Sequence, residues 1–205
     1  MAAGSLKVIT FTPLTALPNI THAFTLRDDA ADTRAAAFQE QFAPGAAWAD
    51  QPHGAGVAHA TGPGEHTGAD ALITRIAGLP LVVRVADCAA VYLVDRRTPA
   101  IGLIHSGKKG TQLNITGATI TALRREFGTH PGDCLALISP SIGPCHYEVD
   151  LWAGIEAQLR AAGVREIHNL RCCTACHLDR FYSYRAEKGQ TGRHLAKIVI
   201  VPQAR

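Results

Sequence analysis

The sequence has no apolar run that approaches the roughly 18 residues of a membrane-spanning helix. Its first residues, MAAGSLKVITFTPL, lack a charged segment followed by a long apolar stretch. The 20 Lys and Arg are scattered, and no basic stripe with interleaved aromatics is found. These absences argue against a membrane protein and against a dedicated nucleic-acid-binding protein. We therefore expect a cytoplasmic protein with no nucleic-acid or membrane partner.

Internal repeats and low-complexity linkers are absent as well. At 205 residues, 47% of them hydrophobic, the chain is long enough to bury one substantial core, so we expect one compact domain over residues 1–205. The six cysteines do not resemble a small secreted disulfide framework, and two of them are adjacent. In a reducing compartment they are expected to be buried thiols, ligands or nucleophiles.

Short apolar runs bounded by Gly, Pro, Asp or Thr predict strands, and longer stretches with helical spacing predict helices. Asp150 is a candidate N-cap, and Gly128 and Gly163 are candidate helix stops. The result is a mixed α/β (α+β) domain. The predicted strands are 6–11, 80–86, 90–95, 100–105, 134–139 and 197–202, and the predicted helices are 33–42, 111–128 and 150–163.

The three strands between Leu81 and His105 follow one another with short breaks, which favours antiparallel or mixed pairing among them. Segments 43–69 and 168–190 are rich in Gly, His, Pro and Cys and are predicted to be loops. Because catalytic and binding residues are concentrated on loops, these two segments are candidates for carrying the site.

The stretch GLIHSGKKGT, residues 102–111, fits the G-x-x-x-x-G-K pattern of a phosphate loop, but Lys109 stands where a Ser or Thr should hold Mg²⁺. The informative residue in it is instead His105. Together with His53 in QPHG and Cys88 in ADC, His105 offers two imidazoles and a thiolate, which suit Zn²⁺. Three protein ligands with a fourth position open are typical of a catalytic zinc site. By spacing alone, each histidine is more often a surface or satisfied core residue, and a lone cysteine between strands is most often a small buried hydrophobe.

Longer motifs carry a family resemblance. The run ADALITRIAGLPLVVRVADCAAVYLVD, followed by AIGLIHSGKKGTQLNI, ISPSIGPCHYEVD and CTACHLDRFYSYRAEKGQTGR, resembles the purine nucleoside phosphorylase family once labelled laccase-domain or multicopper polyphenol oxidase proteins. QPHG and the N-terminal PNITHAFTLR agree with it. A true multicopper oxidase needs several H-x-H pairs, and the sequence has none.

The resemblance implies a single domain with a four-layer α/β/β/α arrangement of mixed sheets. It implies zinc held by His53, Cys88 and His105. It also implies phosphorolysis of adenosine, inosine or guanosine to the base and ribose 1-phosphate, with hydrolytic deamination of adenosine in some members. Purine nucleosides and phosphate are the partners expected, and the oligomeric state is left open.

Other site residues follow from the same motifs. Arg27 matches an arginine of the family's N-terminal segment and is a candidate anion or substrate contact, although a solvated surface role is as plausible. Asp87 could orient a ligand or transfer a proton, or cap a turn. Tyr147 and Glu148 could form a wall of the substrate pocket, or a turn that leads into the helix at Asp150.

The chain departs from the family at the histidine loop, which usually reads H-A-G-W-R-G. Lys108 and Lys109 replace the aromatic and the arginine here. A lysine is a point charge on a flexible stem, so phosphate attraction is kept with altered geometry, and stacking on the tryptophan is lost. The segment between Arg27 and Gln51 is also shorter than in the family.

Three other interpretations stay open. Without metal, Cys88 could be a nucleophile activated by His105, suited to acyl transfer or deamidation. A diverged member could bind a nucleoside or a cell-wall fragment without turnover. Finally, C-x-x-C-H at 173–177 matches a haem-attachment pattern, but the family resemblance explains Cys173 and Thr174 without haem. A second metal site built from Cys172, Cys173, Cys176 and His177 is more plausible than haem, although no second Cys pair lies at zinc-ribbon spacing.

Overall fold

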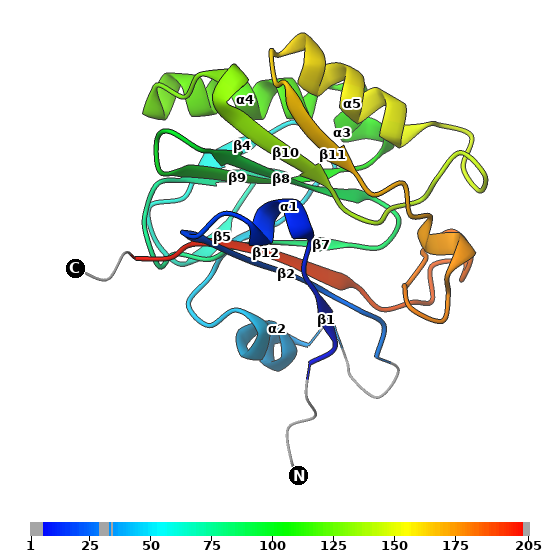
Figure 1. Cartoon of the computed structure of the whole chain (residues 1–205). Helices are drawn as coiled ribbons and strands as arrows, with labels where there is room; N and C mark the ends of the chain where they lie inside the picture. The colour runs from blue at the N-terminus through cyan, green and yellow to red at the C-terminus, as the bar shows by residue number, and fades with distance from the viewer. Residues whose placement is uncertain (1–5, 29–32, 34, 203–205) are drawn as a thin grey trace.

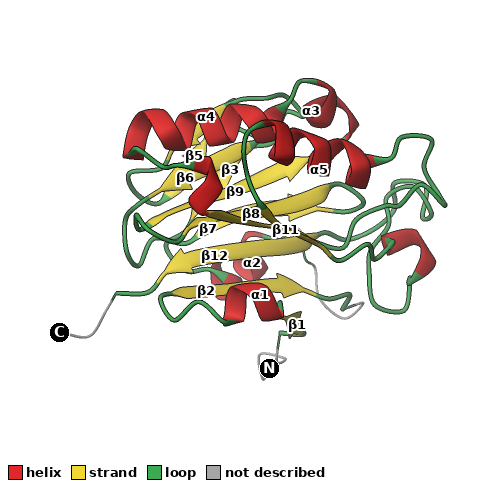
Figure 2. Ribbon diagram, turned by 45° about the horizontal axis from the view of Figure 1, so that its top comes forward, coloured by secondary structure: helices red, strands yellow, loops and turns green. Residues whose placement is uncertain are grey.

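Two six-stranded sheets lie face to face, with helices on their outer sides (Figure 1). The computed structural model describes residues 6–28, 33 and 35–202. Figure 2 shows the strands in stacked layers, with the helices of residues 108–127 and 151–161 above them. This confirms the mixed α/β fold and the α/β/β/α layering that the family resemblance implied. No helix in the described part of the chain is long and apolar enough to cross a membrane.

One sheet, called the lower sheet here, contains both ends of the described chain. Most neighbours in it pair antiparallel, but β3 is parallel to both β5 and β7. In spatial order its strands are β1 (Val8–Ile9), β2 (Ile20–Thr25), β12 (His194–Ile200), β7 (Leu81–Val85), β3 (Ala47–Ala49) and β5 (Gly64–His66).

The other sheet, the upper sheet, is centred on the β8–β9 hairpin and mixes parallel with antiparallel neighbours. Its strands in spatial order are β11 (Glu166–Asn169), β10 (Cys134–Ile138), β8 (Ala89–Asp95), β9 (Ala100–Ser106), β6 (Ala71–Thr74) and β4 (Val57–His59).

Helices cover the outer faces of both sheets, except α1, whose Leu14 packs in the core between the sheets. Apolar residues of α4 and α5 pack on the upper sheet, while Phe38 and Phe42 of α2 pack on the lower sheet. The helices are α1 (Thr12–Thr15), α2 (Ala36–Phe42), α3 (Lys108–Gln112), α4 (Ile115–Phe127) and α5 (Leu151–Ala161), with single 3₁₀ turns η1 (Pro131–Asp133) and η2 (Thr174–Cys176).

Most of the strands predicted from continuous apolar runs are present because both faces of each sheet are buried. On β8, Tyr92 and Val94 face the layer between the sheets, whereas Val91 and Leu93 face the helices. A strand buried on both faces reads as an unbroken apolar run rather than an alternating one. The predicted helix caps are also found, since Asp150 accepts a hydrogen bond from the Ala153 N–H (3.0 Å) and Gly128 ends α4 with φ +71°.

Several expectations were wrong in detail. The helix predicted over 111–128 is broken at Asn114, whose left-handed backbone (φ +57°) separates α3 from α4 and whose side chain caps α4. The helix predicted over 33–42 begins at Ala36, and Arg34 lies outside the described residues. The predicted loop 43–69 contains the short strands β3, β4 and β5.

The largest correction concerns the strands between Leu81 and His105. Strands β8 and β9 form the expected antiparallel hairpin, but β7 belongs to the lower sheet and pairs with β12 and β3. The chain therefore passes from one sheet to the other between Val85 and Ala89. Short connections between apolar strands do not distinguish a hairpin from a crossing between stacked sheets.

Two histidines are buried in the lower sheet as neutral rings. His194 donates from Nδ1 to the Thr25 carbonyl (2.7 Å) and accepts at Nε2 from the Tyr182 N–H (2.8 Å). His22 accepts at Nε2 from the Phe11 N–H (2.7 Å). Burial lowers the pKa of each of them to about 4. A second proton would place a charge in the core and set two N–H donors against each other at Nε2.

The stability of the metal-free protein should therefore fall between pH 7.5 and pH 5.5. In the unfolded chain each histidine binds a proton near pH 6.5, but in the folded chain only near pH 4, so stability is full above pH 6.5 and is lost below it. Over this range the expected loss is about 1.4 kcal/mol in total for each histidine. Urea unfolding at both pH values measures it.

The variant His194→Gln should be less stable at pH 7.5 and show a shallower pH dependence. The exposed His177, changed to Gln, is the matched control and should leave both quantities unchanged. An unaltered slope in His194→Gln would contradict the assignment of His194 as a buried neutral ring.

Candidate functional site

Cys88 and His105 lie at the same edge of the upper sheet because of strand register. In the β8–β9 hairpin Ala90 pairs with His105, and Cys88 directly precedes β8. Both side chains have the parity of residues that face the layer between the sheets, and Cys88 packs against that core. The crossing from β7 to β8 thus brings the thiol to the end of the strand that carries His105.

His53 reaches the same place from the segment between β3 and β4. Gln51 holds this segment to β7, because its side-chain amide donates to the Arg84 carbonyl (2.6 Å) and accepts from the Arg84 N–H (2.8 Å). Gln51 and His53 both have left-handed backbones, with φ of 64° and 63°. The donor atoms of His53, Cys88 and His105 all lie within 4.8 Å of one another.

Asp70, which was not predicted from the sequence, connects the segment of His53 to the strand of His105 through hydrogen bonds. Its carboxylate is fully buried, lies 2.8 Å from Nδ1 of His105, and accepts from the backbone N–H groups of His53 (3.0 Å) and Gly54. A carboxylate partner keeps the proton on Nδ1 and leaves Nε2 of His105 free for a metal. The available signal was an acid within the otherwise apolar run ADALIT.

The charges of the group are coupled. Burial acts to raise the pKa of Cys88, but the charge of His105 and hydrogen bonds from His105 and His53 lower it to about 6. Burial acts to lower the pKa of His105, but Cys88 and Asp70 raise it to about 9. Without metal, the site is therefore a thiolate beside an imidazolium, and the thiolate is the form of cysteine that binds metals.

Gly107 lies in close contact with the side chain of Cys88. A Cβ atom placed there would lie 2.5 Å from Sγ of Cys88, closer than real contacts allow. The loop that follows His105 can approach the thiol only because residue 107 has no side chain. This glycine, which the phosphate-loop pattern would have assigned to a phosphate, serves a close approach to the cysteine instead.

The three side chains open into a cavity of about 1140 Å³. Lys108 and Lys109 line it, as does Tyr147, so the structure brings these predicted substrate residues to the same cavity as the His53, Cys88 and His105 cluster. Apolar and aromatic side chains, including those of Ile142 and Tyr184, form much of the rest. Cationic side chains are prominent in the lining: Arg84, Lys108, Lys109, Arg185, Lys188 and Arg193.

Glu148 does not line the cavity but holds two residues that do. Its carboxylate bonds Lys108 (3.2 Å) and Arg185 (3.1 Å), and the guanidinium of Arg185 lies 4.6 Å from the centre of the Tyr147 ring. A hydrogen bond from its own backbone N–H, together with the hydrogen bond from Lys108, lowers the pKa of Glu148. The expected pocket wall is therefore a set of paired side chains rather than a single face.

Asp87 and Arg27 are found in supporting positions. Asp87 borders the cavity, but its carboxylate accepts from the Thr174 hydroxyl (2.7 Å) and the Arg185 N–H (2.6 Å). Arg27 is not among the cavity-lining residues and pairs with Glu187 at 2.9 Å. Both contacts hold the segment that carries the cavity residues Tyr184 and Arg185.

Comparison with known proteins identifies the group to which this chain is related. A family model described as multi-copper polyphenol oxidoreductase laccase matches residues 22–150 and 149–201. Purine nucleoside phosphorylase of Bacteroides thetaiotaomicron is 33% identical over 165 residues, which is 65% of this chain and 61% of that protein. Purine nucleoside phosphorylase YlmD of Geobacillus stearothermophilus is 32% identical over 64% of this chain and 60% of its own. The chain thus spans about three fifths of these relatives.

A third relative and two solved structures extend the comparison. Purine nucleoside phosphorylase of Deinococcus radiodurans is 32% identical over 73% of this chain and 68% of its own. The crystal structure of YlmD from Geobacillus stearothermophilus superposes with a TM-score of 0.85 at 23% identity, covering 91% of this chain and 93% of that one. The hypothetical protein YfiH of Bacillus licheniformis superposes with a TM-score of 0.86 at 21% identity, covering 96% and 97%.

The two solved structures establish the fold alone, because their identity to this chain is low. The family model and the Deinococcus relative carry more weight, since they match most of the chain in sequence order. On these matches, the chain belongs to the multi-copper polyphenol oxidoreductase laccase family, the family that its motifs resemble.

Proposed function

We propose that residues 1–205 form one zinc-dependent domain that phosphorolyses purine nucleosides to the free base and ribose 1-phosphate. The observation that carries the proposal is a three-ligand cluster, His53, Cys88 and His105, opening into a cavity lined by six cationic side chains. The names of the curated relatives support the reaction class. Adenosine, inosine and guanosine are the proposed substrates, with adenosine deamination as a second reaction of the same cavity.

The donor set fits zinc. Two imidazoles and one thiolate are common zinc ligands, and three protein ligands leave a fourth position for water or substrate. Asp70 supplies the outer carboxylate that such histidine ligands usually have. When bound there, zinc would supply a Lewis acid at the cavity floor.

The chain's own residues supply the remaining requirements of phosphorolysis. A phosphate oxygen forms a bond to C1′ of the ribose while the bond from C1′ to the purine nitrogen breaks, so an anion must be held beside the sugar. Lys108 and Lys109 lie next to the ligand His105 and face the cavity, where they can hold that anion. Tyr147 and Tyr184 provide apolar rings for the nucleoside.

Asp87 and Arg27 act as positioning residues in this proposal. Asp87 binds the backbone of Arg185, and Arg27 pairs with Glu187, two residues farther along the chain. Glu187 in turn accepts hydrogen bonds from the Ser183 N–H (3.0 Å) and the Thr191 hydroxyl (2.5 Å). The segment around Tyr184 and Arg185, which lines one side of the cavity, is thus held by Asp87 at Arg185 and by Arg27 at Glu187.

Removing Cys88 should remove one zinc ion per chain. Cys88→Ala deletes a ligand, so metal analysis after dialysis should show one ion fewer than in the wild type. Asp70→Asn keeps all three ligands but weakens the support of His105, and it should lower zinc affinity by roughly 10- to 100-fold in chelator competition.

The control for Asp70→Asn is Asp150→Asn, an exposed helix cap at which Asn serves as well as Asp. It should bind zinc like the wild type. If Cys88→Ala retains its full zinc content, the proposed ligand set is wrong. A metal-free wild type that is alkylated selectively at Cys88 would instead favour a nucleophilic thiol activated by His105.

Lys108→Ala should raise the KM for phosphate by roughly 3- to 10-fold, because it removes a half-exposed cation beside the metal ligands. The KM for inosine should change less. Release of ribose 1-phosphate from inosine and adenosine, measured over a range of phosphate concentrations, tests this. Lys7→Ala, which removes a lysine paired with Asp28 outside the cavity lining, is the control.

Zinc-loaded wild-type protein that releases no ribose 1-phosphate and forms no inosine from adenosine would contradict the proposed enzyme. Nucleoside binding without turnover would then indicate a binding protein. Equal effects of Lys108→Ala and Lys7→Ala would show that Lys108 does not meet the phosphate.

A further inference from the structure

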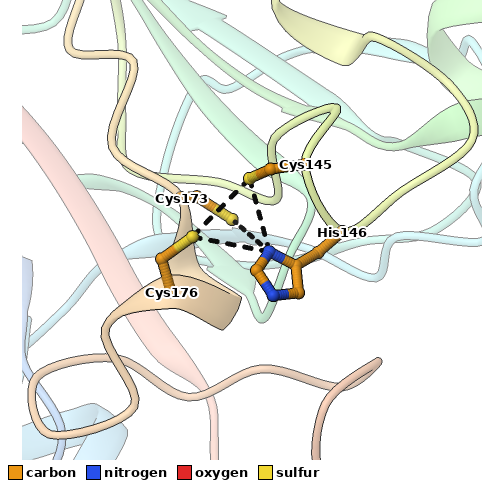
Figure 3. A group of neighbouring side chains, drawn as sticks. All are labelled: Cys145, His146, Cys173 and Cys176. Carbon is orange, nitrogen blue, oxygen red and sulfur yellow. Dashed lines mark hydrogen bonds between the residues drawn. The ribbon is translucent and has the colours of Figure 1, made fainter.

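We propose a second, structural zinc site formed by Cys145, His146, Cys173 and Cys176. Figure 3 shows the three sulfur atoms and Nδ1 of His146 pointing toward one another. All four donor atoms lie within 4.8 Å of one another. None of these residues lines the cavity of the proposed nucleoside site, so the cluster is separate from the one formed by His53, Cys88 and His105.

Backbone contacts bring the two halves of the cluster together. Cys145 and His146 lie between β10 and α5, whereas Cys173 and Cys176 belong to the turn around η2. The Ser141 N–H donates to the Cys172 carbonyl (3.1 Å), and the Thr174 N–H donates to the Ser141 carbonyl (3.1 Å). The loops are therefore paired by main-chain bonds that do not need the metal, and the ligands are presented from a frame already built.

Four of the six distances between donor atoms are close to the edges of a zinc tetrahedron, and the other two are within 4.8 Å. With Zn–S bonds of about 2.3 Å and Zn–N bonds of about 2.0 Å, tetrahedral geometry places two sulfurs about 3.8 Å apart and a sulfur and a nitrogen about 3.5 Å apart. The Sγ atoms of Cys145 and Cys176 are 3.6 Å apart. Nδ1 of His146 lies 3.3, 3.7 and 3.4 Å from Sγ of Cys145, Cys173 and Cys176.

The donor set also indicates the kind of metal and the kind of site. Three thiolates and one imidazole are typical of closed, four-coordinate structural zinc, unlike the two-histidine, one-cysteine group that leaves a position open. The Gly143 N–H donates to Sγ of Cys173 (3.3 Å), the outer hydrogen bond expected for a coordinating thiolate. Cys145, His146 and Cys176 are exposed, so an ion can reach the site from solvent.

The ligand set differs from the one considered from sequence spacing. Cys173 and Cys176 take part, but Cys172 packs against the core between the sheets, and His177 is an exposed residue that ends η2. Their places are taken by Cys145 and His146, about 30 residues earlier. Zinc at this position would connect the loop that carries Tyr147 to the segment that leads to Arg185, and so stabilise one wall of the cavity.

The first test is the zinc content and zinc coordination of the wild type, purified under reducing conditions. We expect two zinc ions per chain by mass spectrometry. X-ray absorption at the zinc edge should give an average of two sulfurs per zinc, because one site supplies three and the other one. A single ion with one sulfur would overturn the second site, and no variant is needed for that result.

Variants then separate the two sites. Cys145→Ser with Cys176→Ser should lose one ion and leave a zinc with one sulfur, and its Tm should fall toward that of chelator-treated protein. Cys172→Ser, the neighbouring cysteine outside the cluster, is the matched control and should keep two ions. In Cys88→Ala with His105→Ala, the remaining ion should show three sulfurs and one nitrogen.

The outcomes distinguish this site from the proposed function. If the variant Cys88→Ala with His105→Ala has the same zinc content as the wild type, and its zinc has three sulfur ligands, the proposed catalytic zinc is refuted and the second site is supported. If the wild type instead carries a Cys145–Cys176 disulfide, detected by peptide mass mapping, and holds no zinc there, the second site is refuted.

Discussion

The buried carboxylate of Asp70 joins three parts of the chain on which the site depends. It accepts hydrogen bonds from the backbone of His53 and Gly54 and from the ring of His105, while the strand that follows it lies beside β9. A buried carboxylate is stable only when its oxygens accept hydrogen bonds. Losing one of these donors would therefore destabilise the charged carboxylate, and losing the carboxylate would leave the donors without a partner. Burial acts to raise the pKa of Asp70, but the hydrogen bonds from His105 and Gly54 lower it, which keeps it charged. The ligand atoms are therefore presented in a preorganised arrangement.

Stacking of two sheets explains why the thiol and the imidazole meet. Each sheet buries both faces, and the parity of β8 and β9 places Cys88 and His105 on the face toward the other sheet. The chain crosses between the sheets just before Cys88, so the cysteine lies at the rim of the interlayer core rather than inside it. Burial at this rim removes water from His105, whereas the exposed His53 and the cavity leave access for a ligand. The same packing that stabilises the fold thus creates the edge on which the site is built.

The cavity combines the His53, Cys88 and His105 cluster at its floor with cationic walls held by ion pairs. Glu148 bonds both Lys108 and Arg185, and Asp87 bonds the backbone of Arg185. These contacts restrict long side chains that would otherwise lose more conformational entropy on binding an anion. The proposed second zinc site stabilises the same wall from outside. The two clusters, with different donor sets, would then have different roles. One would bind a catalytic zinc that is open toward the substrate, and the other a structural zinc that is fully coordinated by the protein.

The sequence by itself determined the core strands β7 to β10 and β12, the caps at Gly128 and Asp150, and the residue types of the His53, Cys88 and His105 cluster, because local hydrophobic runs and motifs encode them. It did not indicate the core strands β2 and β6. It did not determine the three-residue strands β3 to β5, which are too short to carry a pattern and form only by pairing with neighbours. The break at Asn114 was missed as well, although Asn tolerates a left-handed backbone and is a favoured helix N-cap. Only the tertiary structure decided that β7 and β8 lie in different sheets, that Asp70 supports His105, and that Cys145 joins Cys176. Each of these depends on contacts between residues distant along the chain, which no local pattern records.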